Sequence, residues 1–348
     1  MVKTRLALAG LGTIGRKHAD IISASESVDL AAIADPASEA TKLGNHYGVA
    51  VEADLHVMLE RGGIDGVIIA TPSDQHAQHC IDCIERGIPI LVEKPFATNV
   101  IDARKVVEAG YKKGTPILTG HYRRFSPQIE VARETLNSGA IGDLIGVSSI
   151  WAMRKHDAYY DVPWRTMPGG GPILTNLIHD IDCLRWLCGE IVSVSALVSS
   201  KFRGHPVEDT ATITLEFGSG ALASIFLSDA APSPWAYEAT TGENSDFFHM
   251  DECCYRFMGT RGAFDFPLMR LWKAPEGIEP AWQMPMTKSH IPTGPGTPLV
   301  AQIEHFRRVI QGEEMPRCDG AEGARTLAAA LAVVEASSTG NRAVPEAI

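Results

Sequence analysis

The sequence predicts an α/β protein of two domains, and three observations support this fold class. Its 348 residues exceed the size at which a single hydrophobic core usually stops growing. Short apolar runs and helical periodicity alternate over residues 3–119, as a doubly wound parallel sheet requires. Neighbouring strand patterns with alternating faces then dominate residues 192–266. We therefore expect a parallel-sheet domain over 1–121, and over 122–348 an α+β domain with a large, mostly antiparallel open sheet.

The first domain combines buried strands with amphipathic helices. Apolar runs bounded by turn residues predict strands over 6–9, 28–34, 66–70, 89–92 and 116–119. Apolar side chains at helical spacing predict helices over 13–25, 39–47, 54–60, 73–86 and 102–112.

In the second domain, predicted strands outnumber predicted helices. Its predicted strands cover 144–151, 192–199, 210–217, 221–227, 253–258 and 263–266. Its predicted helices cover 128–137, 172–187, 299–310 and 322–337. Residues 274–298 are rich in Pro and Gly, which predicts a long loop.

The turn after the first strand carries the most informative motif. Gly10, Gly12 and Gly15 follow the pattern G-x-G-x-x-G. Gly10 would permit a tight turn, Gly12 would let backbone N–H groups approach a pyrophosphate, and Gly15 would let helix and strand pack closely. The helix N-terminus at Thr13 and Ile14 places positive potential where the phosphates would lie. This unit predicts a Rossmann dinucleotide-binding domain.

Asp35 ends the second strand, where an acid can accept a hydrogen bond from a ribose 2′-hydroxyl. A carboxylate repels a 2′-phosphate, and no Arg occurs in the following Pro36-Ala-Ser-Glu39, so the sequence favours NAD over NADP. The structural alternative is a tight turn in which Asp35 only caps the chain ahead of Pro36.

Composition excludes several function classes. The formal net charge of −11, without a long basic block, argues against nucleic acid and anionic membranes as partners. No apolar run approaches the roughly 18 residues that span a bilayer. The N-terminus runs directly into the first strand, so we expect no signal peptide and a cytoplasmic protein. Cys80 and Cys83 have C-x-x-C spacing, but they fall on a predicted helix without a second pair, so we expect no metal site.

Ligands of open parallel sheets bind beyond the carboxyl ends of the strands. Lys94 follows the strand over 89–92 at this position, where its ammonium could donate to a substrate oxygen. An ordinary solvated lysine is the alternative. The next residue, Pro95, would suit a cis peptide bond. Other residues at these strand ends are expected to contact the cofactor, namely Ala70, Thr71, Pro72, His76 and Glu93.

A second group of polar residues lies on the helix that follows a glycine triplet. Thr175 and Asn176 share a helical face with His179, one turn further on. Histidine is suited to proton transfer near neutral pH, whereas a core histidine with satisfied nitrogens is the alternative. The acids Asp180 and Asp182 would either orient its ring or face solvent.

Taken together and in this order, several motifs resemble the Gfo/Idh/MocA family, the glucose–fructose oxidoreductase and inositol dehydrogenase type. The motifs are the glycine turn, Glu93-Lys94-Pro95, Arg123-Arg124-Phe125-x-Pro127, Trp164-Arg165, and the glycine triplet that leads to His179. The match spans nearly the whole chain.

The resemblance implies Lys94 as the catalytic lysine and His179 as the general acid/base. It implies that Tyr122 and Arg123, with Lys94, Thr175, Asn176 and His179, line the substrate pocket, and that Trp164 and Arg165 reach the cofactor. It also implies a homodimer or homotetramer built through the C-terminal sheet. In one departure, Thr175 stands where many members carry an Asp, which weakens the likeness to inositol dehydrogenase proper but leaves the Lys94–His179 pair.

The sequence therefore predicts an NAD-dependent dehydrogenase that oxidises a secondary alcohol or hemiacetal of a sugar, cyclitol or related polyol. Two alternatives stay open. One is a glycosidase that uses NAD without net redox change, and the other is a redox-inert NAD-binding regulator on the same fold.

Overall fold

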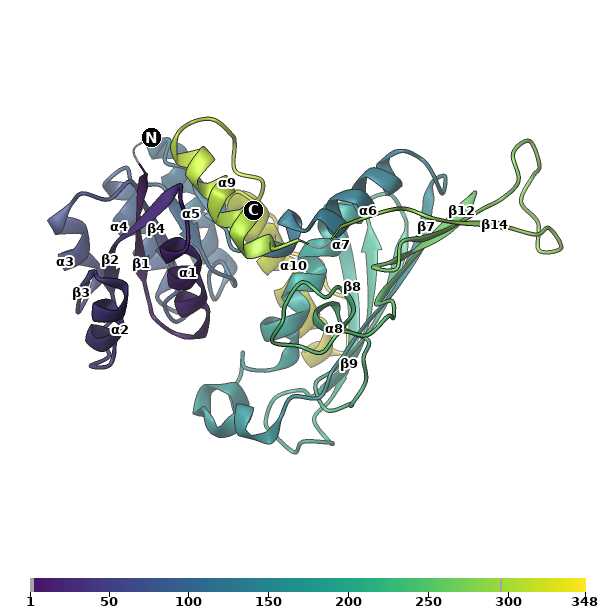
Figure 1. Cartoon of the computed structure of the whole chain (residues 1–348). Coiled ribbons are helices and arrows are strands. Elements are labelled where there is room, and N and C mark those ends of the chain that lie inside the picture. The colour runs from purple at the N-terminus through teal and green to yellow at the C-terminus, as the bar shows by residue number, and fades with distance from the viewer. Residues whose placement is uncertain (1–2, 295) are drawn as a thin grey trace. The chain divides into compact units, whose positions relative to one another are not determined.

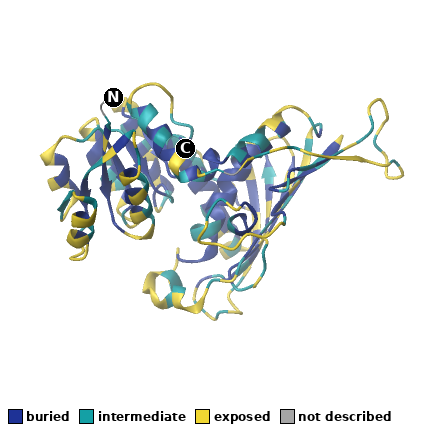
Figure 2. Cartoon of the chain, in the orientation of Figure 1, coloured by how far each residue is buried: buried dark blue, intermediate teal, exposed yellow. Residues whose placement is uncertain are grey.

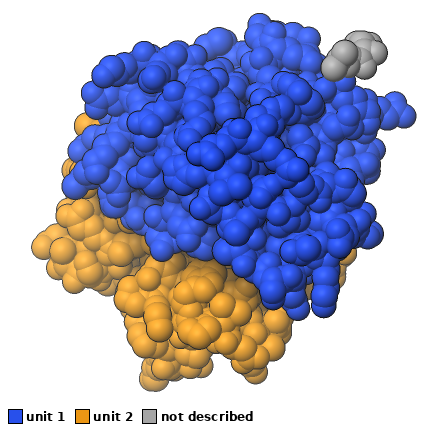
Figure 3. All heavy atoms as spheres, turned by 90° about the vertical axis from the view of Figure 1, so that its left-hand side faces the viewer, with its two compact units in different colours: residues 1–122, 298–328, 348 blue, residues 123–297, 329–347 orange. Residues whose placement is uncertain are grey.

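The computed structural model describes residues 3–294 and 296–348, and the chain forms two compact units (Figure 1, Figure 3). Unit 1 comprises residues 1–122, 298–328 and 348, and unit 2 comprises residues 123–297 and 329–347. Each unit has its own sheet.

Unit 1 contains a six-stranded sheet of order β3-β2-β1-β4-β5-β6, and all its pairings are parallel. The strands are β1 (Thr4–Ala9), β2 (Val28–Ala34), β3 (Ala50–Glu52), β4 (Gly66–Ile69), β5 (Ile90–Val92) and β6 (Ile117–Thr119). The connecting helices are α1 (Thr13–Ser23), α2 (Ala40–Tyr47), α3 (Leu55–Arg61), α4 (His76–Glu85) and α5 (Val100–Lys113). This order is that of a dinucleotide-binding doubly wound sheet and confirms the predicted fold class, with the switch point between β1 and β4.

Local signals set the ends of these helices. Asp54 caps α3 by accepting from the N–H of Val57, and Asn99 caps α5 by accepting from Asp102. Helix α5 ends at Gly114, whose φ of +66° is the left-handed conformation that glycine adopts most readily.

The chain returns to unit 1 after unit 2, which differs from the single boundary expected after residue 121. Helix α9 (Pro298–Ile310) packs against α1. A Cβ atom on Gly66 would lie only 2.5 Å from Ile310 Cδ1, so this glycine lets the helix lie close to the sheet. Ser27 Oγ donates to Glu304 Oε2 at 2.6 Å. These contacts join residues far apart in the sequence, which local periodicity does not reveal.

Unit 2 contains an eight-stranded sheet of order β14-β13-β12-β11-β7-β10-β9-β8. Its strands are β7 (Leu144–Ala152), β8 (Ile191–Ser199), β9 (Thr210–Phe217), β10 (Leu222–Ser228), β11 (Tyr255–Gly259), β12 (Gly262–Phe266), β13 (Arg270–Lys273) and β14 (Thr287–His290). Among the described strands of this sheet, β10 and β7 are the one parallel pair, so the predicted mostly antiparallel sheet is confirmed.

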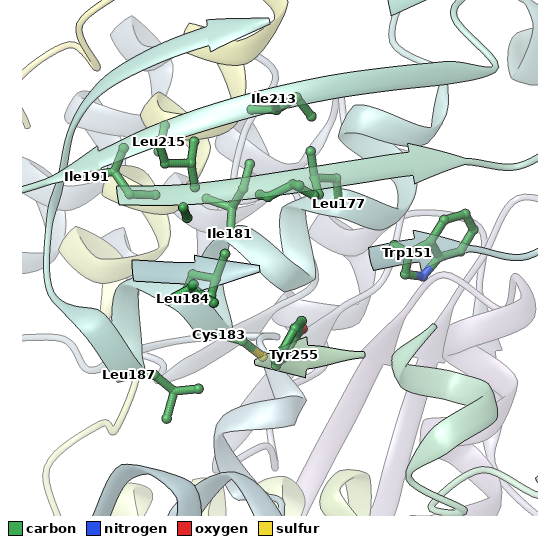
Figure 4. Close-up of a cluster of buried hydrophobic side chains, with 14 of the residues drawn as sticks. Trp151, Leu177, Ile181, Cys183, Leu184, Leu187, Ile191, Ile213, Leu215 and Tyr255 are labelled. Atoms are coloured by element: carbon green, nitrogen blue, oxygen red, sulfur yellow. The ribbon is translucent and has the colours of Figure 1, made fainter. Parts of the chain in front are cut away.

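One face of this sheet carries the core of unit 2. Alternate residues such as Ile213 and Leu215 pack with Ile181 and Leu184 of α7 (Ile178–Cys188) (Figure 4). Residues of α6 (Pro127–Asn137) and of the second part of α10 (Gly320–Thr339) complete this cluster. The burial colours alternate along the strands because the other face stays exposed (Figure 2).

Several short elements were not predicted from the sequence. Strand β14 lies within the predicted loop over 274–298, and its four residues are all exposed. It pairs with β13 through backbone hydrogen bonds at the edge of the sheet, so no apolar alternation marks it. The short pieces β3, β13, α8 (Tyr237–Thr240) and the 3₁₀ turns η1 (Tyr122–Phe125), η2 (Asp157–Asp161) and η3 (Pro163–Thr166) were also missed. No helix among the described residues is long and apolar enough to cross a membrane.

Candidate active site

The glycine turn of unit 1 is built as its spacing predicts. Gly10 has φ +95°, and a Cβ atom there would lie 2.5 Å from the Ala70 carbonyl oxygen. A Cβ atom on Gly15 would lie 2.0 Å from the Gly10 carbonyl oxygen, so both glycines are required by the fold. Gly12 differs, because a Cβ atom there would meet nothing within 4 Å. The fold itself therefore does not require glycine at position 12, and the open space fits a ligand that approaches the backbone closely.

Asp35 holds this turn in place. Its Oδ2 accepts from the N–H of Leu11 at 2.7 Å, and its Oδ1 accepts from the N–H of Ala37 at 2.8 Å. The carboxylate thus both caps the following turn and lies beside the glycine loop. Thr13 is exposed and Ile14 half-buried at the start of α1. These residues fit the adenosine and phosphate groups of a dinucleotide.

His76 joins the segments that follow β4 and β5. Its Nδ1 lies 2.8 Å from the Pro95 carbonyl oxygen and its Nε2 lies 2.9 Å from that of Thr71. The residue is 1% exposed, and burial lowers the pKa of its imidazole despite these two carbonyls. His76 therefore positions Thr71 and the Lys94–Pro95 peptide, which is cis as expected. A direct contact between His76 and the cofactor stays a prediction.

His18 and Glu93 form a buried pair that contacts the backbone of Lys94. His18 was not predicted from the sequence. His18 Nε2 lies 2.7 Å from Glu93 Oε1, and Glu93 Oε2 accepts from the N–H of Lys94 at 3.2 Å. Burial opposes ionisation of Glu93, but the hydrogen bond from His18 and the nearby charges lower its pKa below the ordinary value. A Cβ atom on Gly120 would lie 2.9 Å from Glu93 Oε2, so a glycine at the end of β6 makes room for this carboxylate. The pair fixes the backbone that carries Lys94.

In unit 2, the predicted helix over 172–187 begins with a π-helical turn, η4 (Ile173–Leu177), before α7. Such turns are rare and occur frequently at functional sites. Thr175 and Asn176 lie within η4 and are half-buried, whereas His179 lies in the first turn of α7 and is 8% exposed. The hydroxyl of Thr175 lies 2.9 Å from both the Gly171 carbonyl oxygen and Asn176 Oδ1. The structure thus brings the three predicted residues onto one short segment.

Lys155 is a further polar residue at this segment that the sequence did not single out. Its Nζ lies 3.3 Å from Thr175 Oγ1 and 3.5 Å from Asp229 Oδ2. Its side chain is 12% exposed. Lys155 follows β7, and only the pairing of β7 with β10 brings it near Asp229. No local motif could have revealed this contact.

The acids next to His179 are buried and paired, so they do not face solvent. Arg124 forms a bidentate pair with Asp182, through Nε at 2.9 Å and Nη2 at 2.7 Å. Arg123 Nη1 lies 3.3 Å from Asp180 Oδ2, and its Nη2 donates to Glu238 at 2.7 Å. Burial raises the pKa of Asp180, and the charge of Arg123 opposes this effect.

Arg123 is 1% exposed, and its guanidinium lies 4.0 Å from the centre of the Tyr237 ring. Its contact with Asp180 connects η1 to α7, and its contacts with Glu238 and Tyr237 connect η1 to α8. We interpret Arg123 as a positioning residue for the helix of His179, and its contact with substrate stays a prediction. The same holds for Tyr122, which is half-buried at the start of η1.

Trp164 and Arg165 lie on the 3₁₀ turn η3. Trp164 is 52% exposed, and Arg165 Nη1 donates to the Tyr159 carbonyl oxygen at 2.8 Å. A Cβ atom on Gly170 would lie 2.4 Å from the Trp164 carbonyl oxygen, so the glycine triplet packs directly against this turn.

The C-x-x-C pair has no features of a reactive site. Cys80 and Cys83 are buried and form no disulfide, and burial raises the pKa of the Cys83 thiol to about 12. Within residues 3–294 and 296–348, no three His, Cys, Asp or Glu side chains gather as a metal site would require.

Comparison with known families agrees with this geometry. Residues 4–121 match the model described as an oxidoreductase family with an NAD-binding Rossmann fold, and residues 129–265 match the GFO/IDH/MocA C-terminal domain. The chain belongs to the Gfo/Idh/MocA family of oxidoreductases. The resemblance stated from the motifs is therefore confirmed.

Among Gfo/Idh/MocA relatives, the rhizopine catabolism protein MocA of Rhizobium meliloti is 32% identical over 233 residues, which cover 65% of this chain and 72% of the relative. Inositol 2-dehydrogenase 4 of Saccharopolyspora erythraea is also 32% identical, over 64% of this chain and 65% of its own length. A crystal structure of an Agrobacterium radiobacter oxidoreductase in complex with NAD⁺, L-tartaric acid and magnesium is similar in fold, with a TM-score of 0.81. It shares 21% identity and covers 99% of this chain and 98% of its own.

Proposed function

We propose that this protein is an NAD-dependent dehydrogenase that oxidises a secondary alcohol or hemiacetal of a sugar, cyclitol or related polyol. The observation that carries this proposal is the turn of unit 1, in which Gly12 has open space beside it and Asp35 accepts from the N–H of Leu11. Lys94, which follows β5, and His179, which lies on α7, support the assignment of the chemistry. Relatives named as inositol dehydrogenases support the choice of a polyol.

NAD is preferred over NADP in this proposal. A carboxylate at the end of β2 accepts from a free 2′-hydroxyl and repels a 2′-phosphate. The residues after Asp35 are Pro36, Ala37, Ser38 and Glu39, which offer no cation to a phosphate. Thr71, Pro72, Trp164 and Arg165 remain in the proposed cofactor-binding set.

The proposed chemistry divides between two side chains. When bound, NAD⁺ supplies the hydride acceptor. His179 removes the proton from the substrate hydroxyl, and Lys94 stabilises the negative charge that develops on that oxygen. Asn176 donates to a second hydroxyl, because its Oδ1 lies within hydrogen-bond distance of the Thr175 hydroxyl and leaves the amide N–H groups for a ligand. Positioned acid–base catalysis of this kind contributes about 10²- to 10⁴-fold in rate.

A second candidate is the transient use of NAD without net redox change. It is favoured by a relative of Mediterraneibacter gnavus, 27% identical over 53% of this chain, that is named a 2,7-anhydro-N-acetylneuraminate hydratase. Such an enzyme would convert its substrate without accumulating NADH.

The exposed face of the unit 2 sheet supports a homodimer or homotetramer. Met258, Gly146 and Leu222 lie side by side across β11, β7 and β10, and Phe226, Thr212 and Leu197 form a second row. Leu197 is 76% and Leu222 59% exposed. Apolar side chains in such rows favour association with a second copy. Light scattering of Leu222→Lys should show a shift toward monomers.

The experiment that tests the proposed function is a panel of sugars, sugar acids and cyclitols incubated with NAD⁺ and, in parallel, with NADP⁺. Formation of NADH, at a higher rate than NADPH, is the expected result. Conversion of a substrate without NADH would instead support the second candidate. Binding of NADH with no conversion of any compound would contradict both.

A further inference from the structure

Glu208 joins the sheet of unit 2 to the start of the helical segment that carries His179. It lies two residues before β9, and its Oε1 accepts from the backbone N–H of Ile173 at 3.0 Å. Ile173 is the first residue of η4, and the first N–H groups of a helical segment lack partners in a preceding turn. The carboxylate of Glu208 therefore caps the segment that continues into α7.

The last glycine of the triplet, Gly171, leaves room for this carboxylate. A Cβ atom there would lie 2.2 Å from Glu208 Oε1 and 2.3 Å from Oε2. Gly171 does not have a positive φ, so its backbone conformation does not itself require glycine. Its carbonyl oxygen accepts from the N–H of Thr175 at 3.1 Å and from the hydroxyl of Thr175 at 2.9 Å. The contact with Glu208 thus lies one helical turn from the polar residues of η4.

The backbone that carries Glu208 is held on both sides. The N–H of the next residue, Asp209, donates to the carbonyl oxygen of Ser199 at 2.8 Å. The carbonyl oxygen of Asp209 accepts from the N–H of Asp229 at 3.0 Å. Ser199 ends β8 and Asp229 follows β10, so the position of Glu208 is set by the sheet. Its hydrogen bond with Ile173 relates the start of η4 to that sheet.

The ionised form of Glu208 is costly where it lies. Burial raises the pKa of Glu208, and the nearby charge of Asp229 acts in the same direction. The N–H of Ile173 and the charge of Lys155 lower this pKa. Burying a charge costs more than burying a neutral group, and ionisable side chains with a shifted pKa cluster at functional sites.

We propose that Glu208 is a positioning residue for the dehydrogenase reaction, because its hydrogen bond with Ile173 sets where η4 begins and therefore where Asn176 and His179 lie. This inference rests on the proposed function, which assigns Asn176 and His179 to hydroxyls of the substrate. Glu208 acts through the helical segment and does not touch the substrate. A displacement of about 1 Å at reacting groups costs about 10²-fold in rate, so a single cap at this place has a large effect on turnover.

Two replacements of Glu208 separate its hydrogen bond from its charge. Glu208→Ala should lower kcat with NAD⁺ and a polyol by about 10- to 100-fold. Glu208→Gln should keep kcat within about threefold, because an amide oxygen also accepts from the N–H of Ile173. The KM for NAD⁺ should change less than about twofold in both variants, since the glycine turn and Asp35 lie in unit 1. A Glu208→Gln enzyme as slow as Glu208→Ala, or a Glu208→Ala enzyme with the natural kcat, would overturn the inference.

Asp54→Ala serves as the matched control, because it removes a carboxylate cap from α3 without touching η4. Asp54 accepts from the N–H of Val57 at 3.0 Å. This variant should lose stability comparable to the loss of a helix cap, while its kcat stays within about twofold. A loss of kcat in Asp54→Ala equal to that in Glu208→Ala would show that capping acts only through general stability and would overturn the inference.

Gly171→Ala tests the same contact from its other side and keeps Glu208 in the chain. The added methyl group should displace the carboxylate and lower kcat by about tenfold or more. The double variant Gly171→Ala with Glu208→Ala should be no slower than the slower single variant, because both changes remove one contact. Losses that multiply in the double variant would contradict the inference.

Amide hydrogen exchange over residues 171–179 separates this inference from the proposed function, since it requires no substrate. Exchange of this segment should be about tenfold or more faster in Glu208→Ala and close to natural in Glu208→Gln. This result in a protein that oxidises no polyol would support the contact and contradict the dehydrogenase. Unchanged exchange in Glu208→Ala, in an enzyme that does oxidise polyols, would overturn the inference and leave the dehydrogenase in place.

Discussion

Asp35 Oδ2 accepts a hydrogen bond of 2.7 Å from the backbone N–H of Leu11, so the acid that ends β2 also fixes the turn between Gly10 and Gly12. The same carboxylate accepts from the N–H of Ala37 through its other oxygen. One side chain therefore shapes the glycine loop and places a negative charge beside it. The predicted ribose contact and the structural alternative of a turn cap are compatible roles for this residue.

Replacement of Asp35 by Asn should weaken both roles. An amide has one oxygen for the N–H groups of Leu11 and Ala37, and it carries no charge to repel a 2′-phosphate. We expect the preference for NADH over NADPH, measured as the ratio of dissociation constants, to fall by about tenfold or more. Asp29→Asn removes an equal charge from the exposed start of β2 and should leave the ratio unchanged. An unaltered ratio in Asp35→Asn would contradict the role in cofactor choice.

The two glycines of the turn should respond differently to alanine. Gly12→Ala places a methyl group where no protein atom lies within 4 Å, so the free energy of unfolding should change little while NADH affinity falls by about tenfold or more. Gly10→Ala forces a side chain onto φ +95° and against the Ala70 carbonyl, and should destabilise the fold by about 1–3 kcal/mol. Denaturant unfolding and NADH titration of both variants check this contrast. If Gly12→Ala bound NADH normally, the open space would not be the phosphate site.

The ion pair between Arg124 and Asp182 should be costly to break from one side. Both side chains are at most 1% exposed, so a single replacement leaves a buried charge without its partner. Arg124→Met should lower the free energy of unfolding by about 3–5 kcal/mol. The double variant Arg124→Met with Asp182→Leu should recover a large part of this loss. A double variant no more stable than the single one would contradict this explanation.

We predict that His305 contributes to the acid sensitivity of unit 1. Its Nε2 accepts from the N–H of Arg317 at 3.0 Å and its Nδ1 lies 2.6 Å from Glu314, which defines a neutral ring. Burial lowers the pKa of His305, and the hydrogen bond that its Nδ1–H donates to Glu314 opposes this effect. A group whose pKa is lower in the folded state stabilises the fold above its unfolded pKa, and this stability is lost as the pH falls from about 6.5.

The melting temperature should therefore decrease between pH 7 and pH 5.5, and by less in His305→Gln than in the natural protein. Equal pH dependence of both proteins would show that His305 does not contribute to acid sensitivity.

Local periodicity explains why the Rossmann domain, its glycine motif and most strands of the second sheet could be predicted. The failures occur where structure depends on distant residues. His18 and Glu93 are 75 positions apart, and the position of Lys155 beside Asp229 depends on the pairing of β7 with β10. Strand β14 is held by backbone hydrogen bonds at a sheet edge and buries no side chain, so its sequence resembles a loop.

The candidate site follows the same rule. Lys94 and His179 were identified from motifs whose residues are close in sequence. The partners that position them, His76 and Glu93 for the lysine loop and Arg123 for the helix of His179, act through contacts that the sequence does not encode locally.

Turnover by the natural protein, Lys94→Ala and His179→Ala, with NAD⁺ and the best polyol of the panel, tests the central claim most directly. We predict that each variant loses about 10²-fold or more in the rate of NADH formation, because each removes a group that acts on the reacting hydroxyl. NADH affinity should stay within about threefold in both variants. Unchanged turnover in either variant would contradict the assignment of that residue to catalysis.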